Sequence, residues 1–124
     1  MSMVKGYREL IVYQKAYKLA MEIFEITRSF PREEKYSLTD QIRRSSRSVT
    51  SNLAEAWARK QYIKSFINKL TDSLGEEYET EVWLDYSRDC GYISLSTHSD
   101  LMNKSDEVRK MLLSMINHPE KWHL

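Results

Sequence analysis

Three arginines stand among serines in DQIRRSSRSVTSNLAEAWARK, residues 40 to 60, and they are the side chains best suited to chemistry in this sequence. Arg43 and Arg47 are four residues apart, which places them on one face of a helix, with Arg44 beside them. A guanidinium group can donate two parallel hydrogen bonds to a phosphate. The spacing therefore predicts phosphate contacts with RNA or DNA. The basic side chains that would extend this surface are Arg59, Lys60 and Lys64.

A second interpretation gives the same arginines a structural role. Residues 72 to 85 contain six acids and no basic residue. The arginines can form ion pairs with these acids, within one subunit or between two subunits. The two interpretations are compatible, because not every arginine needs an acidic partner.

Other polar residues of the same stretch indicate structure rather than catalysis. Ser48 and Asn52 lie one turn apart and are predicted to form a hydrogen-bonding pair between helices. The letters RRSS resemble a kinase target, but Ser45 falls on the predicted buried side, where phosphorylation would require unfolding. No base is spaced to activate a serine or Cys90, and no glycine-rich phosphate loop is present. We expect no enzymatic activity and no cofactor.

The acids also raise the question of a metal site. Helical bundles that hold two irons use glutamates from separate helices and two Glu-x-x-His pairs. This sequence has one such pair, Glu120 and His123, in a short tail after Pro119. A tail of this length cannot contribute to a bundle core, so we expect no bound metal.

Composition shows which elements must position these residues. The chain has 124 residues with only three glycines and two prolines, which favours one domain, residues 1–124, made of long helices. The net charge of +1 indicates no partner by itself. The sequence predicts a cytoplasmic protein that is not inserted in a membrane. It has a single cysteine, no apolar run of about 18 residues, and no signal sequence at its N-terminus.

Hydrophobic periodicity predicts four helices, at about residues 9–29, 37–60, 62–90 and 97–117. Short connections between them predict an all-α, antiparallel, up-down-up-down four-helix bundle. The expected inward residues of the first helix are Val12, Ala16, Leu19, Ala20, Ile23, Ile26, Thr27 and Phe30. Those of the second are Leu38, Ile42, Ser45, Val49, Leu53 and Ala56. Those of the third are Ile63, Phe66, Ile67, Leu70, Leu74, Tyr78, Val82 and Tyr86. Those of the fourth are Leu101, Val108, Leu112 and Met115.

Helix ends and glycines give further expectations. Ser37 is placed to cap the second helix, with Asp40 completing a variant of the capping box. Gly91 is placed to end the third helix in a left-handed conformation. Gly75, within the third helix, indicates either a bend or a close contact.

Aromatic residues are more numerous than one small core needs. The sequence has eight tyrosines and three tryptophans. Exposed aromatic surface on a bundle marks a subunit interface more often than a platform for stacking bases. We therefore expect a homo-oligomer.

Several of these segments, taken in order, resemble the family of 23S ribosomal RNA intervening-sequence proteins. The segment YRELIVYQKAYKLAMEIFEIT, residues 7–27, is similar to the family's first helix. The segment FPREEKYSLTDQIRRSSRSVTSNLAEAWAR, residues 30–59, is the most specific match. The segment ETEVWLDYSRDCGYIS, residues 79–94, is similar to the end of the third helix in one branch. The chain differs at Ala56, where the family usually has glycine, and in the length of the pattern around residues 76–81.

This resemblance implies a four-helix bundle that assembles into a ring, with a pentamer expected. Family members are encoded inside intervening sequences of bacterial ribosomal RNA genes. The family is also similar to the accessory variability determinant of diversity-generating retroelements, a basic pentamer that binds nucleic acid and a reverse transcriptase. By position, Arg43, Arg44 and Arg59 match basic residues of the family pattern, and Asn52 and Glu55 match its polar motif. The resemblance implies no enzymatic activity.

Overall fold

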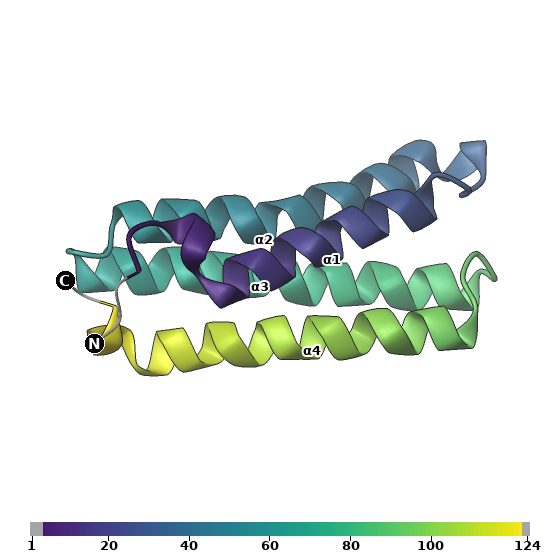
Figure 1. Ribbon diagram of the computed structural model, residues 1–124. Coiled ribbons are helices and arrows are strands. Elements are labelled where there is room, and N and C mark those ends of the chain that lie inside the picture. Colours follow the sequence, from purple (N-terminus) through teal and green to yellow (C-terminus); the bar gives the residue numbers. More distant parts are fainter. Residues whose placement is uncertain (1–3, 123–124) are drawn as a thin grey trace.

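The computed structural model describes residues 4–122 and shows a bundle of four long helices within that range. These are α1 (Ile11–Thr27), α2 (Asp40–Ala58), α3 (Ile63–Asp89) and α4 (Leu95–Asn117). Both α1 and α3 pack against α2 and α4, so α1 and α3 lie diagonally across the bundle. Successive helices run in opposite directions (Figure 1), which confirms the predicted up-down-up-down fold. No helix between residues 4 and 122 has both the length and the apolar character needed to span a membrane.

The start of the second helix differs from the expectation. A five-residue π-helical turn, Lys35–Thr39, runs directly into α2, so Ser37 already lies inside helical backbone. Its hydroxyl donates instead to Glu34 Oε1 at 2.6 Å. The predicted capping box is therefore wrong, because no free helix start exists at Ser37 for the side chain to cap.

The end of the third helix confirms the role expected of Gly91. Its φ is +79°, in the left-handed region. The Gly91 N–H donates to Arg88 O, and the Tyr92 N–H reaches back to Ser87 O, each at 2.9 Å. This pair of bonds is the Schellman motif, which satisfies carbonyls at a helix end. Ser94 then caps α4 by accepting the Thr97 N–H at 3.0 Å.

Replacing Gly91 with Ala should lower the free energy of unfolding by about 1 kcal/mol, because a Cβ strains the left-handed conformation. No atom lies within 4 Å of the added Cβ, so conformation rather than crowding causes the loss. Urea unfolding measures it. The matched control is Gly6→Ala, where space is equally open but φ is −164°; an equal loss in both variants would contradict this explanation.

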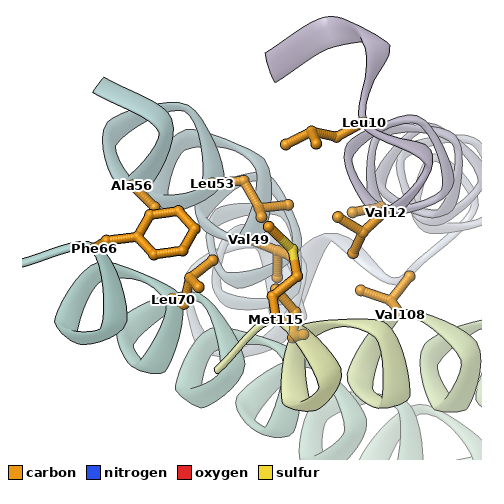
Figure 2. Close-up of a cluster of buried hydrophobic side chains, with 11 residues drawn as sticks. Leu10, Val12, Val49, Leu53, Ala56, Phe66, Leu70, Val108 and Met115 are labelled. Carbon is orange, nitrogen blue, oxygen red and sulfur yellow. The ribbon is translucent and has the colours of Figure 1, made fainter. Parts of the chain in front are cut away.

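The inward sides of α1, α2 and α4 were predicted well. All six residues expected inside from Leu38 to Ala56 are buried, as are the four expected in α4. Of the eight residues expected inside from Val12 to Phe30, Ile26 and Phe30 are half-buried and the other six are buried; Phe30 lies after the end of α1. One large core cluster joins all four helices (Figure 2), and it includes Leu10, Leu53, Phe66, Leu70 and Met115.

The inward side of α3 was predicted correctly only in part. Phe66 and Leu70 are fully buried, and Ile67 and Leu74 are half-buried. The other expected core residues, Ile63, Tyr78, Val82 and Tyr86, are between 41% and 56% exposed. The predicted row takes every fourth residue, and each such step advances about 40° around the helix, or roughly 160° from Leu70 to Tyr86. The buried residues that replace it are Ser73, Glu77, Thr80, Leu84 and Ser87.

The buried polar residues of α3 are satisfied across the bundle. Ser73 donates to Val49 O at 2.8 Å, and Thr80 lies 2.8 Å from Ser45, both on α2. Gly75 is exposed, and a Cβ built there meets nothing within 4 Å. The close contact considered for Gly75 is therefore absent within the described chain.

The first and last described segments meet at one end of the bundle (Figure 1). Val4 and Trp122 both line an apolar cavity of about 210 Å³, whose walls come mainly from the start of α1 and the end of α4.

Candidate nucleic-acid interface

The three central arginines do come together on the surface of α2. They line a shallow open depression of about 510 Å³, here called the arginine depression. Its lining residues are Asp40, Arg43, Arg44, Arg47, Ser48 and Ser51. Because these residues follow successive turns of one helix, the helix alone sets their spacing. Their guanidinium groups, however, have three different environments.

Arg43 is held against α1. Its Nε donates to Thr27 Oγ1 at 2.8 Å, and Nη2 approaches Phe24 O at 3.5 Å. The guanidinium lies 4.7 Å from the centre of the Phe24 ring, which is a favourable cation–π contact. Arg43 is thus half-buried and fixed in direction, with part of its donor fork already used.

Arg44 turns the other way, toward α3. Its Nη2 donates to Glu79 Oε1 at 3.1 Å, and Nη1 lies 3.9 Å from Glu76 Oε2. Burial and the Glu79 carboxylate raise the pKa of Glu76, while Arg44 and Ser48 lower it. The structural interpretation therefore holds for Arg44, whose charge is largely matched within the same chain.

Arg47 is the most available of the three. It is exposed and rests 5.7 Å from the centre of the Phe24 ring. Among residues 4–122, no carboxylate lies within ion-pair distance of either Arg43 or Arg47. Sequence spacing indicated that these two side chains share a face, and Phe24 on the neighbouring helix is the common support that it did not reveal.

The other predicted basic residues form a separate group at the connection between α2 and α3. Arg59 lies about 18 Å along the helix axis from Arg47 and donates to Ser65 Oγ at 3.4 Å. Lys60 sits 4.2 Å from the centre of the Trp57 ring, and Lys64 is exposed on the first turn of α3. The predicted basic face is thus two separate groups, one on α2 and one at the connection between α2 and α3, and a single phosphate cannot contact both.

The predicted polar motif works mainly inside α2. Ser48 Oγ donates to Arg44 O, and Asn52 Nδ2 donates to Ser48 O, both at 2.8 Å. Both side chains therefore bond to a carbonyl one turn back in α2, and of the two only Ser48 also interacts across helices within the described chain, with Glu76 of α3, whose pKa it lowers. Glu55 does reach α3, where Lys69 Nζ lies 3.1 Å from its Oε2.

One polar cluster was missed by the sequence reasoning. Glu77 is only 1% exposed, between α3 and α4. Ser105 Oγ lies 2.8 Å from Glu77 Oε2 and 2.9 Å from Glu81 Oε2, and Arg109 Nε donates to Glu81 Oε2 at 3.1 Å. The signal that would have identified it is the spacing of Ser73, Glu77, Thr80 and Leu84, which follows the bundle repeat of about 3.5 residues.

Between residues 4 and 122, no group of three or more His, Cys, Asp or Glu side chains is placed to hold a metal ion. His123 of the Glu120–His123 pair lies outside the described residues. Cys90 is a free, exposed thiol.

Comparisons with known proteins agree with this architecture. A family model described as 23S rRNA-intervening sequence protein matches residues 8–114. The chain is also similar to the crystal structure of a protein of unknown function from the S23 ribosomal protein family of Bacteroides thetaiotaomicron VPI-5482. The two share 33% sequence identity with a TM-score of 0.78, over 86% of this chain and 96% of that one. No significant match was found among curated proteins. Because the family model covers nearly the whole bundle, this chain belongs to the 23S rRNA-intervening sequence protein family.

Proposed function

We propose that this protein is a non-enzymatic homo-oligomer that binds the phosphate backbone of RNA or DNA through the arginine depression of α2. The observation that carries the proposal is the pair Arg43 and Arg47, which share the Phe24 ring and have no carboxylate partner in residues 4–122. Two fixed positive charges one helical turn apart suit an anionic polymer, because phosphates repeat along it.

The guanidinium groups are the donors in this site. Ser48 donates its hydroxyl proton to Arg44 O, and Ser51 donates to Ser48 O at 3.2 Å. Arg47 has all its guanidinium N–H groups available to a phosphate. Arg43 has only some of them available, because its Nε already donates to Thr27. Arg44 contributes few donors while it is bonded to Glu79. Asp40 at the rim opposes binding. The family description refers to 23S rRNA, which makes RNA the first polymer to test.

Replacing Arg47 with Gln should weaken binding and reduce the dependence of binding on salt. Removal of one bond to a phosphate should lower the slope of log K against log salt by about 0.9 for a duplex and about 0.7 for a single strand. Fluorescence anisotropy with labelled RNA and DNA of equal length, at several salt concentrations, measures both quantities.

The matched control is Lys110→Gln on α4, which removes the same charge from a helix on another side of the bundle. Equal losses from the two variants would show that only net charge matters. Absence of any RNA or DNA binding by the unaltered protein at low salt would refute the proposal.

A second candidate function is a structural or adaptor oligomer that binds no nucleic acid. The ion pair between Arg44 and Glu79 favours it, because it shows a basic residue of α2 used to hold helices together. In such an oligomer Arg43 and Arg47, which have no carboxylate partner within residues 4–122, would pair with α3 acids of an adjacent subunit, so the double variant Arg43→Glu, Arg47→Glu separates the two. Loss of assembly on a sizing column supports the structural role, whereas intact assembly with loss of RNA binding supports the first proposal.

A further inference from the structure

An exposed tyrosine stands among basic residues at the connection between α2 and α3. Tyr62 is 70% exposed, and within residues 4–122 its ring makes no stacking or cation–π contact. Arg59 precedes it by three residues and Lys64 follows it by two. These three residues are here called the connection patch. The connection lies at the same end of the bundle as Val4 and Trp122 (Figure 1).

The connection carries positive charge that its neighbours do not neutralise. Residues 56–71 contain no acid and four basic residues, which are Arg59, Lys60, Lys64 and Lys69. The flanking acids, Glu55 and Asp72, both lie within 3.5 Å of Lys69 Nζ. Arg59 makes one long hydrogen bond, to Ser65 Oγ at 3.4 Å. Within residues 4–122 no carboxylate lies within ion-pair distance of Arg59 or Lys64, so both cations are left for an anionic partner.

The described ends of the chain keep this end of the bundle basic. They add three basic residues and two acids, which are Lys5, Arg8, Lys121, Glu9 and Glu120. Lys60 contributes differently from the patch, because its ammonium lies over the Trp57 ring, 4.2 Å from the ring centre. The surface around Tyr62 therefore combines a free aromatic face with an excess of positive charge.

Tyr36 shows that exposure alone does not make such a surface. It is 74% exposed and also has a lysine nearby, since Lys35 Nζ lies 5.3 Å from its ring centre. It stands before the start of α2, at the opposite end of that helix from Tyr62, and directly follows Glu33 and Glu34. Two acids beside the ring oppose a polyanion there, whereas the connection patch has none.

The combination in the connection patch suits an unpaired base with its phosphates. An exposed aromatic ring can stack on a base only when the face of that base is free, as it is in a single strand and not inside a duplex. Arginine and lysine on either side of the ring can then contact the phosphates that flank the base.

We propose that the connection patch stacks an unpaired base on Tyr62 and makes the protein prefer single-stranded RNA to duplex RNA. This second site rests on the proposed function, because it binds the same polymer as the arginine depression. The patch begins about 18 Å along the axis of α2 from Arg47. At about 3.4 Å per nucleotide, a stacked strand of about six nucleotides has the length to contact both sites.

Replacing Tyr62 with Leu removes the stacking face without changing charge. The probes are a labelled single-stranded RNA of about 12 nucleotides, its duplex, and an abasic strand of the same length. Fluorescence anisotropy should show binding of the single strand weakened about tenfold, with the duplex and the abasic strand unaffected. Tyr62→Phe keeps a ring and should bind like the unaltered protein.

Two further variants separate stacking from charge and from position. Lys64→Gln should lower the slope of log K against log salt by about 0.7 for the single strand, whereas Tyr62→Leu should leave the slope unchanged. The matched control is Tyr36→Leu, at the equally exposed tyrosine beside a lysine, and it should leave binding of all three probes unchanged.

The outcomes decide between a base-stacking residue and a structural one. If Tyr62→Leu weakens the single strand and the duplex equally, or weakens neither, Tyr62 stacks no base and the proposal is wrong. A changed sedimentation coefficient for Tyr62→Leu, with unchanged circular dichroism, would place Tyr62 in a subunit interface and overturn it as well.

The same RNA distinguishes this site from the arginine depression. Loss of binding in Tyr62→Leu but not in Arg47→Gln would leave the connection patch standing and refute the depression. Loss in Arg47→Gln but not in Tyr62→Leu would do the reverse. If the unaltered protein binds none of the three probes at low salt, both proposals are wrong.

Discussion

Replacing Glu77 with Gln is expected to stabilise the protein by about 2 kcal/mol at pH 8 and to have little effect at pH 5. Burial raises the pKa of Glu77 to about 7; the Glu81 carboxylate raises it further, while Ser105 and Arg109 lower it. The folded protein therefore holds a proton on Glu77 at pH 6 that the unfolded chain releases.

The hydrogen bonds around Ser105 agree with a protonated Glu77. A hydroxyl has one proton, yet Ser105 Oγ lies within 2.9 Å of carboxylate oxygens of both Glu77 and Glu81. If Ser105 donates to Glu81, which Arg109 also contacts, then the remaining bond is made by Glu77 donating to Ser105. Gln can supply an equivalent donor through its amide, without a charge.

The proton on Glu77 also determines the direction in which stability changes with pH. Between about pH 4.5 and 7 the folded state binds more protons at Glu77 than the unfolded state, so its contribution to stability falls as pH rises. The full effect is about 3 kcal/mol at most. The second amide N–H of Gln needs a partner and offsets about 1 kcal/mol of the gain.

Urea unfolding of both proteins at pH 5, 6, 7 and 8 measures the effect. Subtracting the two curves removes contributions from carboxyls such as Asp106, whose pKa is lowered mainly by its bond to Lys110. The control Glu33→Gln, at an exposed carboxyl, should leave the curve unchanged. If the free energies of unfolding of Glu77→Gln and the unaltered protein differ by the same amount at all four pH values, Glu77 does not hold a buried proton.

Leu84→Ala is expected to lower the free energy of unfolding by about 3 kcal/mol. Leu84 is fully buried in a cluster with Leu19, Ile23, Ile42 and Leu101 near the far end of α3. Removing three carbons there loses hydrophobic burial and leaves a cavity between helices that can close only partly.

Val82→Ala is the matched comparison, since the every-fourth-residue pattern placed Val82 inside and the structure exposes it. Its cost should be below about 0.5 kcal/mol. Denaturant unfolding of both variants gives the ratio of the two losses. If the two variants lose comparable free energy of unfolding, α3 has instead the orientation that the every-fourth-residue pattern predicted, with Val82 inside.

The sequence predicted the buried side of a helix correctly where one side has apolar or small residues and the other has charged residues. On α2 and the π-helical turn before it, every residue from Leu38 to Ala56 expected inside is buried, even Ser45, because arginines at neighbouring positions exclude the opposite orientation. On α3 both sides carry apolar residues, so periodicity alone allowed two orientations. The chain buries Ser73, Glu77 and Thr80 because hydrogen-bond partners on α2 and α4 offset their polarity.

The candidate site was predictable in its residue types but not in its pairings. Helical spacing placed Arg43, Arg44 and Arg47 together, and all three line one depression. Which of them is neutralised depends on distances between helices. Those distances bring Glu79 to Arg44 and Phe24 to Arg43, and no spacing within α2 contains that information.

The meeting of Val4 and Trp122 around one cavity bears on how the chain can be rearranged. A short linker between these two points would close the polypeptide into a circle without displacing a helix. Cutting that circle at exposed Gln61, between α2 and α3, yields a circular permutant whose order begins with α3 and whose helix contacts are all retained. Fusion partners attached to such a permutant would leave from the connection beside Arg59 and Lys64, which lies at the same end of the bundle as Val4 and Trp122 but between α2 and α3 (Figure 1).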